Sequence, residues 1–223
     1  MEDSTHTGAL LVVGAGPGVG MAVARRFGGV PVGLIARDEV RLRAMTETLR
    51  LEGRTVASAA ADASDPTALR AAIGRIIAEL GGIDTACFSP LPPVATIKRA
   101  AATDAEDLLT ALALVVGGAA TTVRAVLPGM LARGSGRLLF TTGSGALHPS
   151  PERASPAVYT AAQTAYIDVL RRDLSGRGVA VAHVAVVGPV GADGHRPEDV
   201  ADALHDLADE GGSTVLHLTE GAR

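Results

Sequence analysis

The strongest constraint on the fold is a glycine-rich turn that directly follows an apolar run: residues 10–20 read LLVVGAGPGVG. Gly14 permits a tight turn, Gly18 lets the backbone approach a pyrophosphate, and Gly20 allows a helix to pack closely on the strand. The helix that opens here presents unpaired N–H groups and the positive end of its dipole. We therefore predict that the turn holds the phosphates of a dinucleotide, with an ordinary flexible strand-to-helix turn as the alternative. The residues assigned to it are Gly14, Gly16, Gly18, Val19 and Gly20.

Short apolar or β-branched runs alternate with longer amphipathic stretches along the chain. This alternation is typical of βαβ units, in which helices cover a parallel sheet. We predict an α/β fold of the doubly wound, Rossmann-like type, with three layers, a seven-stranded parallel sheet and one domain over residues 1–223. Strands are expected at 9–13, 30–36, 55–60, 83–88, 137–142, 179–187 and 214–218, and helices at 18–27, 39–52, 66–80, 104–133, 156–175 and 197–208. Loops 89–94 and 148–156 follow strand ends, so we expect them to wall the ligand crevice.

The amino-acid composition indicates which binding partners and which cellular compartment to expect. The chain has 20 Lys and Arg against 24 Asp and Glu, with no basic cluster, so we do not expect it to bind nucleic acid. Its single cysteine, Cys87, cannot form an internal disulfide. The polar, acidic start MEDSTHTG lacks the pattern of a signal peptide, and apolar stretches such as 112–116 are too short to span a membrane. We therefore expect a cytoplasmic protein that does not enter a membrane.

Two charged residues follow the second and third predicted strands. Arg37 stands where an acid would accept hydrogen bonds from the ribose 2′-hydroxyl of NAD, whereas an arginine pairs with the 2′-phosphate of NADP. We therefore predict NADP (NADPH) rather than NAD. The alternative makes Arg37 a solvated surface charge and Asp38 a helix N-cap. Asp62 is placed to accept a hydrogen bond from an adenine amino group, or else serves as a loop residue or cap.

These motifs resemble the short-chain dehydrogenase/reductase family over nearly the whole chain. The spacing G-x-x-x-G-x-G at Gly14, Gly18 and Gly20 matches the fingerprint of that family. Further matches are Arg37, Asp62, the segment Leu127-Pro128-Gly129-Met130, Tyr159 near a helix start, Gly188 after the sixth strand, and the PEDVA segment at 197–201. The resemblance implies that Gly188 joins the cofactor site.

Members of this family typically have a catalytic Asn, Ser, Tyr and Lys, and the resemblance locates each position here. Tyr159 is present, but the Tyr-x-x-x-Lys motif ends in Gln163, and Val115 occupies the Asn position. After the fifth strand the sequence TTGS supplies either Ser144, shifted by one position, or Thr142 in place of serine. The resemblance therefore implies an atypical active site of Tyr159, Gln163, Ser144 and Thr142, with no metal ligands.

The absence of the lysine determines whether we expect reduction or oxidation of the substrate. The amide of Gln163 can hydrogen-bond a ribose hydroxyl but cannot stabilise a phenolate by charge, so Tyr159 should stay protonated, with a pKa of about 10. A neutral phenol can donate a proton during reduction but is a poor base for alcohol oxidation. We predict an NADP-dependent oxidoreductase that reduces a carbonyl or imine of a small-molecule substrate. Tyr159 is the expected proton donor and His148 a second candidate.

Two alternative functions remain open. The fold could support non-redox chemistry, as a cyclase, dehydratase or isomerase, or it could be a catalytically silent nucleotide-binding protein. Individual residues also have plainer interpretations: Tyr159 as a packing residue, Ser144 as part of a flexible turn, and His148 as a surface residue. His183 and Tyr166 are expected in the core.

The resemblance also bears on assembly and on access to the site. Family members commonly pair through the helices that correspond to 104–133 and 156–175, so we expect a homodimer or homotetramer. The family usually inserts a lid of one or two helices after the sixth strand, whereas only residues 189–196 intervene here. A shortened lid implies an open pocket.

Overall fold

The computed structural model of the chain describes residues 8–217, which fold around one parallel sheet of seven strands. The sheet order is β3-β2-β1-β4-β5-β6-β7, so the chain builds outward from β1 in one direction and then, from β4, in the other. Such a reversal leaves a crevice beyond the carboxyl ends of the strands. The predicted fold class and sheet are confirmed. The strands are β1 (Ala9–Val13), β2 (Val32–Ala36), β3 (Val56–Ala60), β4 (Ile83–Phe88), β5 (Gly136–Gly143), β6 (Val179–Val187) and β7 (Gly212–His217).

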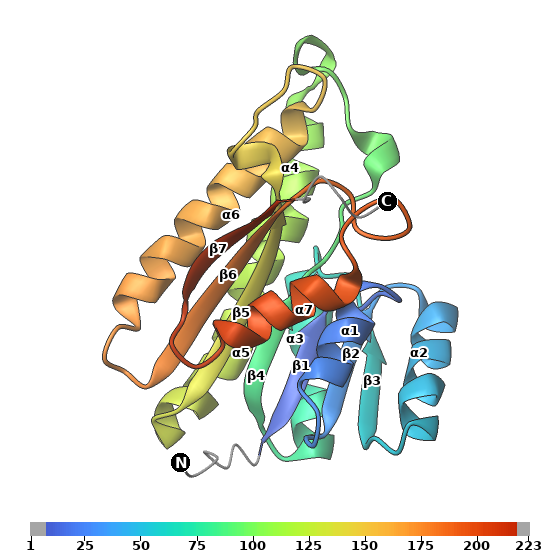
Figure 1. The fold of residues 1–223 in the computed structure, drawn as a ribbon, viewed down its shortest axis with the longest axis vertical. Coiled ribbons are helices and arrows are strands. Elements are labelled where there is room, and N and C mark those ends of the chain that lie inside the picture. Colours follow the sequence, from blue (N-terminus) through green and yellow to red (C-terminus); the bar gives the residue numbers. More distant parts are fainter. Residues whose placement is uncertain (1–7, 218–223) are drawn as a thin grey trace.

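Helices cover both faces of this sheet, giving three layers. One layer holds α1 (Val19–Arg26), α2 (Glu39–Leu51) and α7 (Pro197–Asp206), and the other holds α3 (Pro66–Leu80), α5 (Gly118–Arg133) and α6 (Ala154–Asp173). Figure 1 shows α1 and α7 in front of the sheet, with α3 and α5 behind it. Short 3-10 turns lie at η1 (Val94–Thr96), η2 (Ala100–Ala102) and η4 (Ser144–Ala146).

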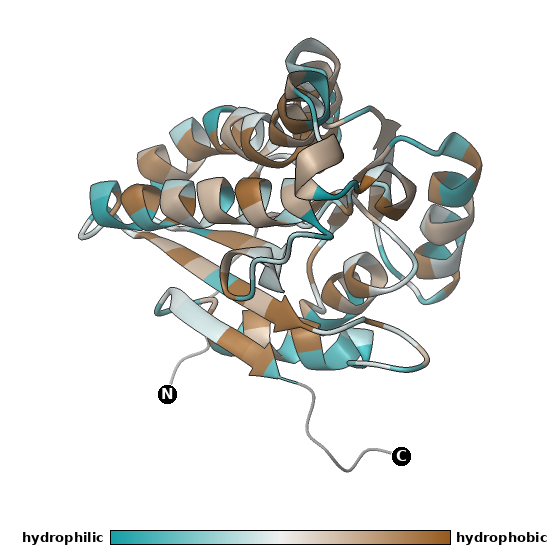
Figure 2. Cartoon of the chain, turned by 90° about the horizontal axis from the view of Figure 1, so that it is seen from above, coloured by the Kyte–Doolittle hydropathy of each residue, from teal (hydrophilic) through white to brown (hydrophobic). Residues whose placement is uncertain are grey.

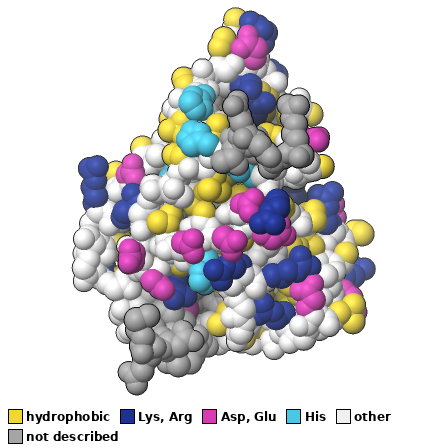
Figure 3. Space-filling view, viewed as in Figure 1, with side chains coloured by type: hydrophobic (Ala, Val, Ile, Leu, Met, Phe, Trp, Pro, Cys, Tyr) yellow, Lys and Arg dark blue, Asp and Glu magenta, His cyan; other side chains and the backbone are white. Residues whose placement is uncertain are grey.

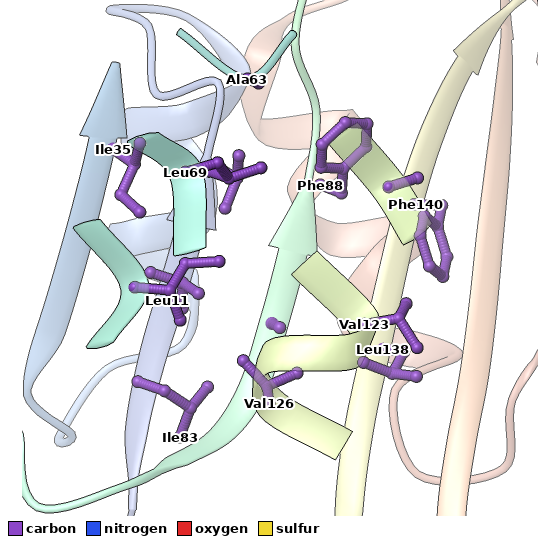
Figure 4. Packing of buried hydrophobic residues seen from close by; sticks show 14 of the residues in the cluster. Leu11, Ile35, Ala63, Leu69, Ile83, Phe88, Val123, Val126, Leu138 and Phe140 are labelled. Carbon is purple, nitrogen blue, oxygen red and sulfur yellow. The ribbon is translucent and has the colours of Figure 1, made fainter. Parts of the chain in front are cut away.

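Two apolar cores hold the helical layers against the sheet. Hydropathy colouring shows that the strands are largely apolar and that apolar and hydrophilic residues alternate along the helices (Figure 2). The first core lies between the sheet and α3, α5 and α6; the second lies between the sheet and α1, α2 and α7. Small residues bring the layers close: a Cβ on Gly33 of β2 would lie 2.5 Å from Cγ2 of Ile76 on α3. In the first core, Phe88 and Phe140 lie beside each other on β4 and β5 (Figure 4).

The predicted helix at 104–133 is divided by a widened turn. It consists of α4 (Ala105–Leu112), a π-helical turn at Ala113–Gly117, and α5. A π turn changes only the hydrogen-bond register of a helix, so the apolar pattern that predicts the helix does not reveal it.

The same helical run corrects the expectation about membrane-spanning length. Ala105–Arg133 forms 29 continuous helical residues, long and apolar enough to cross a membrane, and 33% of its most apolar window is buried. Counting uninterrupted apolar residues missed this run, because a helix also includes polar positions such as Thr121 and Thr122. In this structure α5, the second part of the run, packs on β4, β5 and α3, and α4 packs on α6.

Predicted element bounds agree with the other observed bounds to within two residues. The last predicted strand, 214–218, corresponds to β7, and its final residue, Leu218, lies outside the described residues. Residues 1–7, which underlie the expectation about a signal peptide, lie outside them as well.

Candidate cofactor and catalytic site

The turn between β1 and α1 requires glycine at two positions. Gly14 has a φ of +80°, and a Cβ there would lie 2.4 Å from Cα of Pro90. Gly20 is buried, and a Cβ there would lie 3.0 Å from Cα of Ala15. The structure therefore confirms the tight turn at Gly14 and the close packing of helix on strand at Gly20.

The start of α1 is open at the carboxyl end of β1. A Cβ on Gly16 would meet no described atom within 4 Å, and one on Gly18 would meet Cγ of Pro197 at 3.7 Å. Gly18 is the N-cap and supplies no side-chain hydrogen bond, and the helix begins at Val19. The first backbone N–H groups are therefore left to an outside acceptor, which fits the predicted pyrophosphate.

Arg37 and Asp62 follow the neighbouring strands β2 and β3. Arg37 is exposed and makes no hydrogen bond or ion pair with another of residues 8–217. Asp62 accepts hydrogen bonds through Oδ1 from the Oγ of Ser64 at 2.7 Å and from its backbone N at 2.8 Å. These bonds, with a smaller attraction from Arg37, hold the pKa of Asp62 below its usual value despite partial burial. Asp38 is the N-cap of α2, as the alternative interpretation of this segment predicted.

Tyr159 lies on α6 with its ring against the first core. It is half-buried, and its phenol oxygen has no hydrogen-bond partner among the described residues. Burial raises the pKa of Tyr159, and the positive charge of Arg153 offsets this in part. The phenol is therefore protonated at neutral pH, as expected for a site without the lysine.

Gln163 lies one turn after Tyr159 and is only 2% exposed. Its Nε2 has no hydrogen-bond partner among residues 8–217. Leaving a buried donor unpaired costs about 1–3 kcal/mol, so this amide suits an acceptor from outside the protein. A ribose hydroxyl of the predicted cofactor would supply one.

The two candidate hydroxyls after β5 lie in different surroundings. Thr142 is buried, and its Oγ1 is 2.9 Å from Nε2 of His183, which is also buried. Ser144 opens η4, is half-buried, and has no side-chain hydrogen bond within the described residues. A Cβ on Gly145 would lie 2.4 Å from the backbone oxygen of Pro156, so η4 packs against the start of α6. Thr142 is thus engaged inside the protein, and Ser144 is the hydroxyl left available beside α6.

His183 and His148 differ in the same way. His183 lies within β6, and its bond to Thr142 confirms the expected satisfied core histidine. Burial lowers the pKa of His183 to about 4. His148 is exposed in the loop after η4, where its backbone N donates to the oxygen of Ser144 at 2.8 Å.

The remaining family positions show what has replaced the usual groups. Val115 lies in the π-helical turn and is buried in the first core, so its side chain offers no hydrogen bond. Gly188 follows β6 with a φ of +113°. The segment after it is compact, because His195 donates from Nε2 to the oxygen of Val187 at 3.0 Å. Within the described part of the chain, no lid helix separates β6 from α7.

Sequence reasoning missed two features of this region. One is the charge of Arg153, which acts on Tyr159 although it lies six residues earlier. The other is a pair of hydroxyls, Ser89 and Thr141, at the ends of β4 and β5. Strand alternation could have separated Thr141 from Thr142, since neighbouring residues of a strand face opposite ways. No group of three or more His, Cys, Asp or Glu side chains among residues 8–217 is placed to hold a metal ion.

Comparison with known proteins gives consistent matches. A family model described as short chain dehydrogenase matches residues 9–198. A short chain dehydrogenase of Pseudocercospora fijiensis is 32% identical over 176 residues, covering 76% of this chain and 55% of that protein. A fatty acyl-CoA reductase of Mycobacterium tuberculosis is 30% identical over 169 residues, covering 73% and 55%. The chain thus spans about half the length of these curated relatives.

Among solved structures, an NADPH-bound short chain oxidoreductase of Pseudomonas aeruginosa PAO1 has the same fold. Its TM-score is 0.85 at 21% identity, with 97% of this chain and 96% of that chain covered. That protein is described as containing an atypical catalytic center.

Proposed function

The chain belongs to the short chain dehydrogenase family, and from this premise we propose that it is an NADP-dependent oxidoreductase that reduces a carbonyl or imine group of a small molecule. The observation that carries the proposal is Tyr159, a protonated phenol that lies one helical turn from the buried, unpaired amide of Gln163. The first residue can give a proton, and the second can hold a ribose. The NADPH bound to the similar structure and the reductase among the relatives support this choice.

The proposed cofactor site uses backbone donors at the start of α1 and side-chain donors after β2 and on α6. The N–H groups at Gly18, Val19 and Gly20 bind the pyrophosphate, and the exposed guanidinium of Arg37 pairs with the 2′-phosphate. Arg37 favours NADP because NAD carries only a hydroxyl at that position. When bound, the reduced nicotinamide supplies the hydride.

Three further groups complete this assignment. Asp62 has one carboxylate oxygen, Oδ2, without a hydrogen bond to the described residues, and this oxygen accepts from the adenine amino group. Gln163 donates from Nε2 to the nicotinamide-side ribose. Gly188, exposed after β6, borders the nicotinamide.

Tyr159 supplies the proton of the reduction. Its phenol O–H donates to the substrate oxygen or nitrogen as the neighbouring carbon accepts the hydride, and Ser144 donates a hydrogen bond to the same atom. Because burial raises the pKa of Tyr159, the residue is present as the phenol, which can donate its proton, whereas the phenolate needed to accept a proton is scarce. The proposed enzyme therefore reduces its substrate much faster than it oxidises the product. Thr142 supports β5 from inside, through its bond to His183.

As a second proposal, the protein binds NADPH but does not oxidise it. Val115 and Gln163 remove two polar groups that the family normally uses, which favours either non-redox chemistry as a cyclase, dehydratase or isomerase, or a silent nucleotide-binding protein. Both versions retain the glycine turn. They differ from a reductase because bound NADPH would not be consumed.

We also propose a cytoplasmic homodimer or homotetramer in which residues 1–223 act as one domain. Large apolar side chains are exposed on α4 and α6, at Leu109 and Val169, where a second copy would cover them. Acidic and basic side chains intermingle on the face shown in Figure 3, which gives no support to a nucleic-acid partner.

The test measures NADPH consumption with aldehydes, ketones and cyclic imines. Replacing the general acid, as Tyr159→Phe, should lower turnover by about 10²- to 10⁴-fold. Tyr166→Phe is the matched control, because Tyr166 is also half-buried against the first core. Bound NADPH that no substrate class consumes would support the second proposal, and equal turnover in both variants would remove Tyr159 from the mechanism.

A further inference from the structure

Two hydroxyl groups meet at the carboxyl ends of β4 and β5. Ser89 Oγ and Thr141 Oγ1 are 2.6 Å apart and half-buried. The strand register explains the meeting: Phe88 pairs with Phe140, so the next residue of each strand lies beside the other. The pair is thus positioned by the sheet rather than by a flexible loop.

The pair stands beside the glycine turn. Backbone N of Ser89 donates to the oxygen of Val13 at 2.9 Å, and Pro90 is the residue that a Cβ on Gly14 would strike. Two positions earlier on each strand, Cys87 and Leu139 belong to the second core. By strand alternation the two hydroxyls therefore point toward the layer of α1 and α7.

Counting protons shows that one O–H group of the pair has no acceptor among the described residues. Each hydroxyl has one proton, and the bond between the two oxygens uses only one of them. Neither hydroxyl has a second hydrogen-bond acceptor among the described residues. One O–H group therefore remains free to donate to a ligand oxygen.

The strand order indicates which part of a dinucleotide lies there. Arg37 follows β2 and the glycine turn follows β1. On the next two strands of the sheet, Ser89 follows β4 and Thr141 lies near the end of β5. Neighbouring strands are about 4.8 Å apart, so a dinucleotide held at Arg37 and at the turn extends its other half over β4 and β5. We infer that the Ser89–Thr141 pair donates a hydrogen bond to an oxygen on the nicotinamide half of NADP. This inference rests on the proposed function.

Thr142 provides a matched control for this assignment. Thr142 follows Thr141 on β5, and its side chain points to the opposite face of the sheet. Its hydroxyl is hydrogen-bonded to His183. Thr142→Val removes the same chemical group from the neighbouring position, on the opposite face of the sheet.

The experiment compares NADPH with 2′,5′-ADP, which contains the 2′-phosphate and adenosine but lacks the nicotinamide half. Because either oxygen can hold the outward proton, both are removed together in Ser89→Ala/Thr141→Val. Losing one hydrogen bond should weaken NADPH binding by about three- to tenfold, measured by calorimetry. Affinity for 2′,5′-ADP should not change, which also shows that the double variant is folded. Thr142→Val should bind both ligands like the wild type.

Two results would overturn the inference while the proposed function stands. In one, the double variant binds NADPH as tightly as the wild type. In the other, NADPH and 2′,5′-ADP lose affinity equally, so the pair does not act on the nicotinamide half. A wild-type protein that binds neither ligand would instead overturn the proposed function, and this inference with it.

Discussion

The two halves of the sheet differ in how much of the family pattern they retain. Around β1, β2 and β3, the glycine turn, Arg37 and Asp62 follow the carboxyl ends of the strands, where we propose that they bind the dinucleotide. Around β4, β5 and α6, the usual Asn and Lys positions hold Val115 and Gln163. The first half is typical of its family and the second is not.

Binding a cofactor and using it therefore depend on different kinds of feature. The binding proposed for the first half depends mainly on backbone geometry, such as the left-handed conformation of Gly14 and the open start of α1. The catalysis proposed for the second half depends on the charge and pKa of single side chains, which one substitution can alter. A chain can therefore retain the former while the latter changes, and the predictions below separate the two.

The largest loss of stability is expected from a substitution at Gly14, in the half of the sheet around β1, β2 and β3. In Gly14→Ala the new Cβ meets Pro90 and the residue must adopt a left-handed φ. Backbone strain and overpacking together should lower the free energy of unfolding by about 2–5 kcal/mol, measured by urea denaturation. Gly16→Ala is the control, since its Cβ would meet no described atom within 4 Å. Equal stability of the two variants would contradict this account of the turn.

A smaller effect, a loss of stability at low pH, is expected from the buried histidine His183 on β6. Burial lowers the pKa of His183 to about 4, and the charge of Arg171 adds to this. An unfolded histidine has a pKa of about 6.5, so the unfolded state binds the proton first as the pH falls. His183 should therefore reduce the free energy of unfolding between about pH 6.5 and pH 4, by about 3 kcal/mol, with no further loss below.

Urea denaturation at a series of pH values checks this expectation, with His183→Gln as the control. The variant has no titrating group at this position, so its stability should fall less over the same interval. If the wild type and the variant show the same pH dependence, His183 is not the neutral core residue described above.

The smallest effect tests the charge that acts on Tyr159. Arg153→Gln should raise the pKa of Tyr159 further, because only burial would then act on the phenol. Phenolate absorbance can follow this residue in a Tyr166→Phe background, since the chain has two tyrosines and no tryptophan. Arg172→Gln, at the far end of α6, is the control with the same loss of charge. A pKa that moves equally in both variants would show that only net charge matters.

The sequence could predict the fold because β1, β2, β4 and β6 are almost wholly buried and their sequences are apolar runs between helix signals. It could predict the glycine turn because the required conformations are specific to glycine. It could not predict that Thr142 bonds to His183 or that Ser89 meets Thr141, since both contacts depend on the register of neighbouring strands. The π turn at Ala113–Gly117 was hidden because it leaves the helical pattern nearly unchanged.

The most direct test of the separation between the halves is calorimetric titration of the wild type and Arg37→Glu with NADPH and NADH. The account predicts that the wild type binds NADPH more tightly than NADH, and that Arg37→Glu weakens NADPH by about 100-fold while sparing NADH. Arg70→Glu, the same charge change on α3, should behave like the wild type. If the wild type binds neither nucleotide, the cofactor half is a structural turn only and the central claim is wrong.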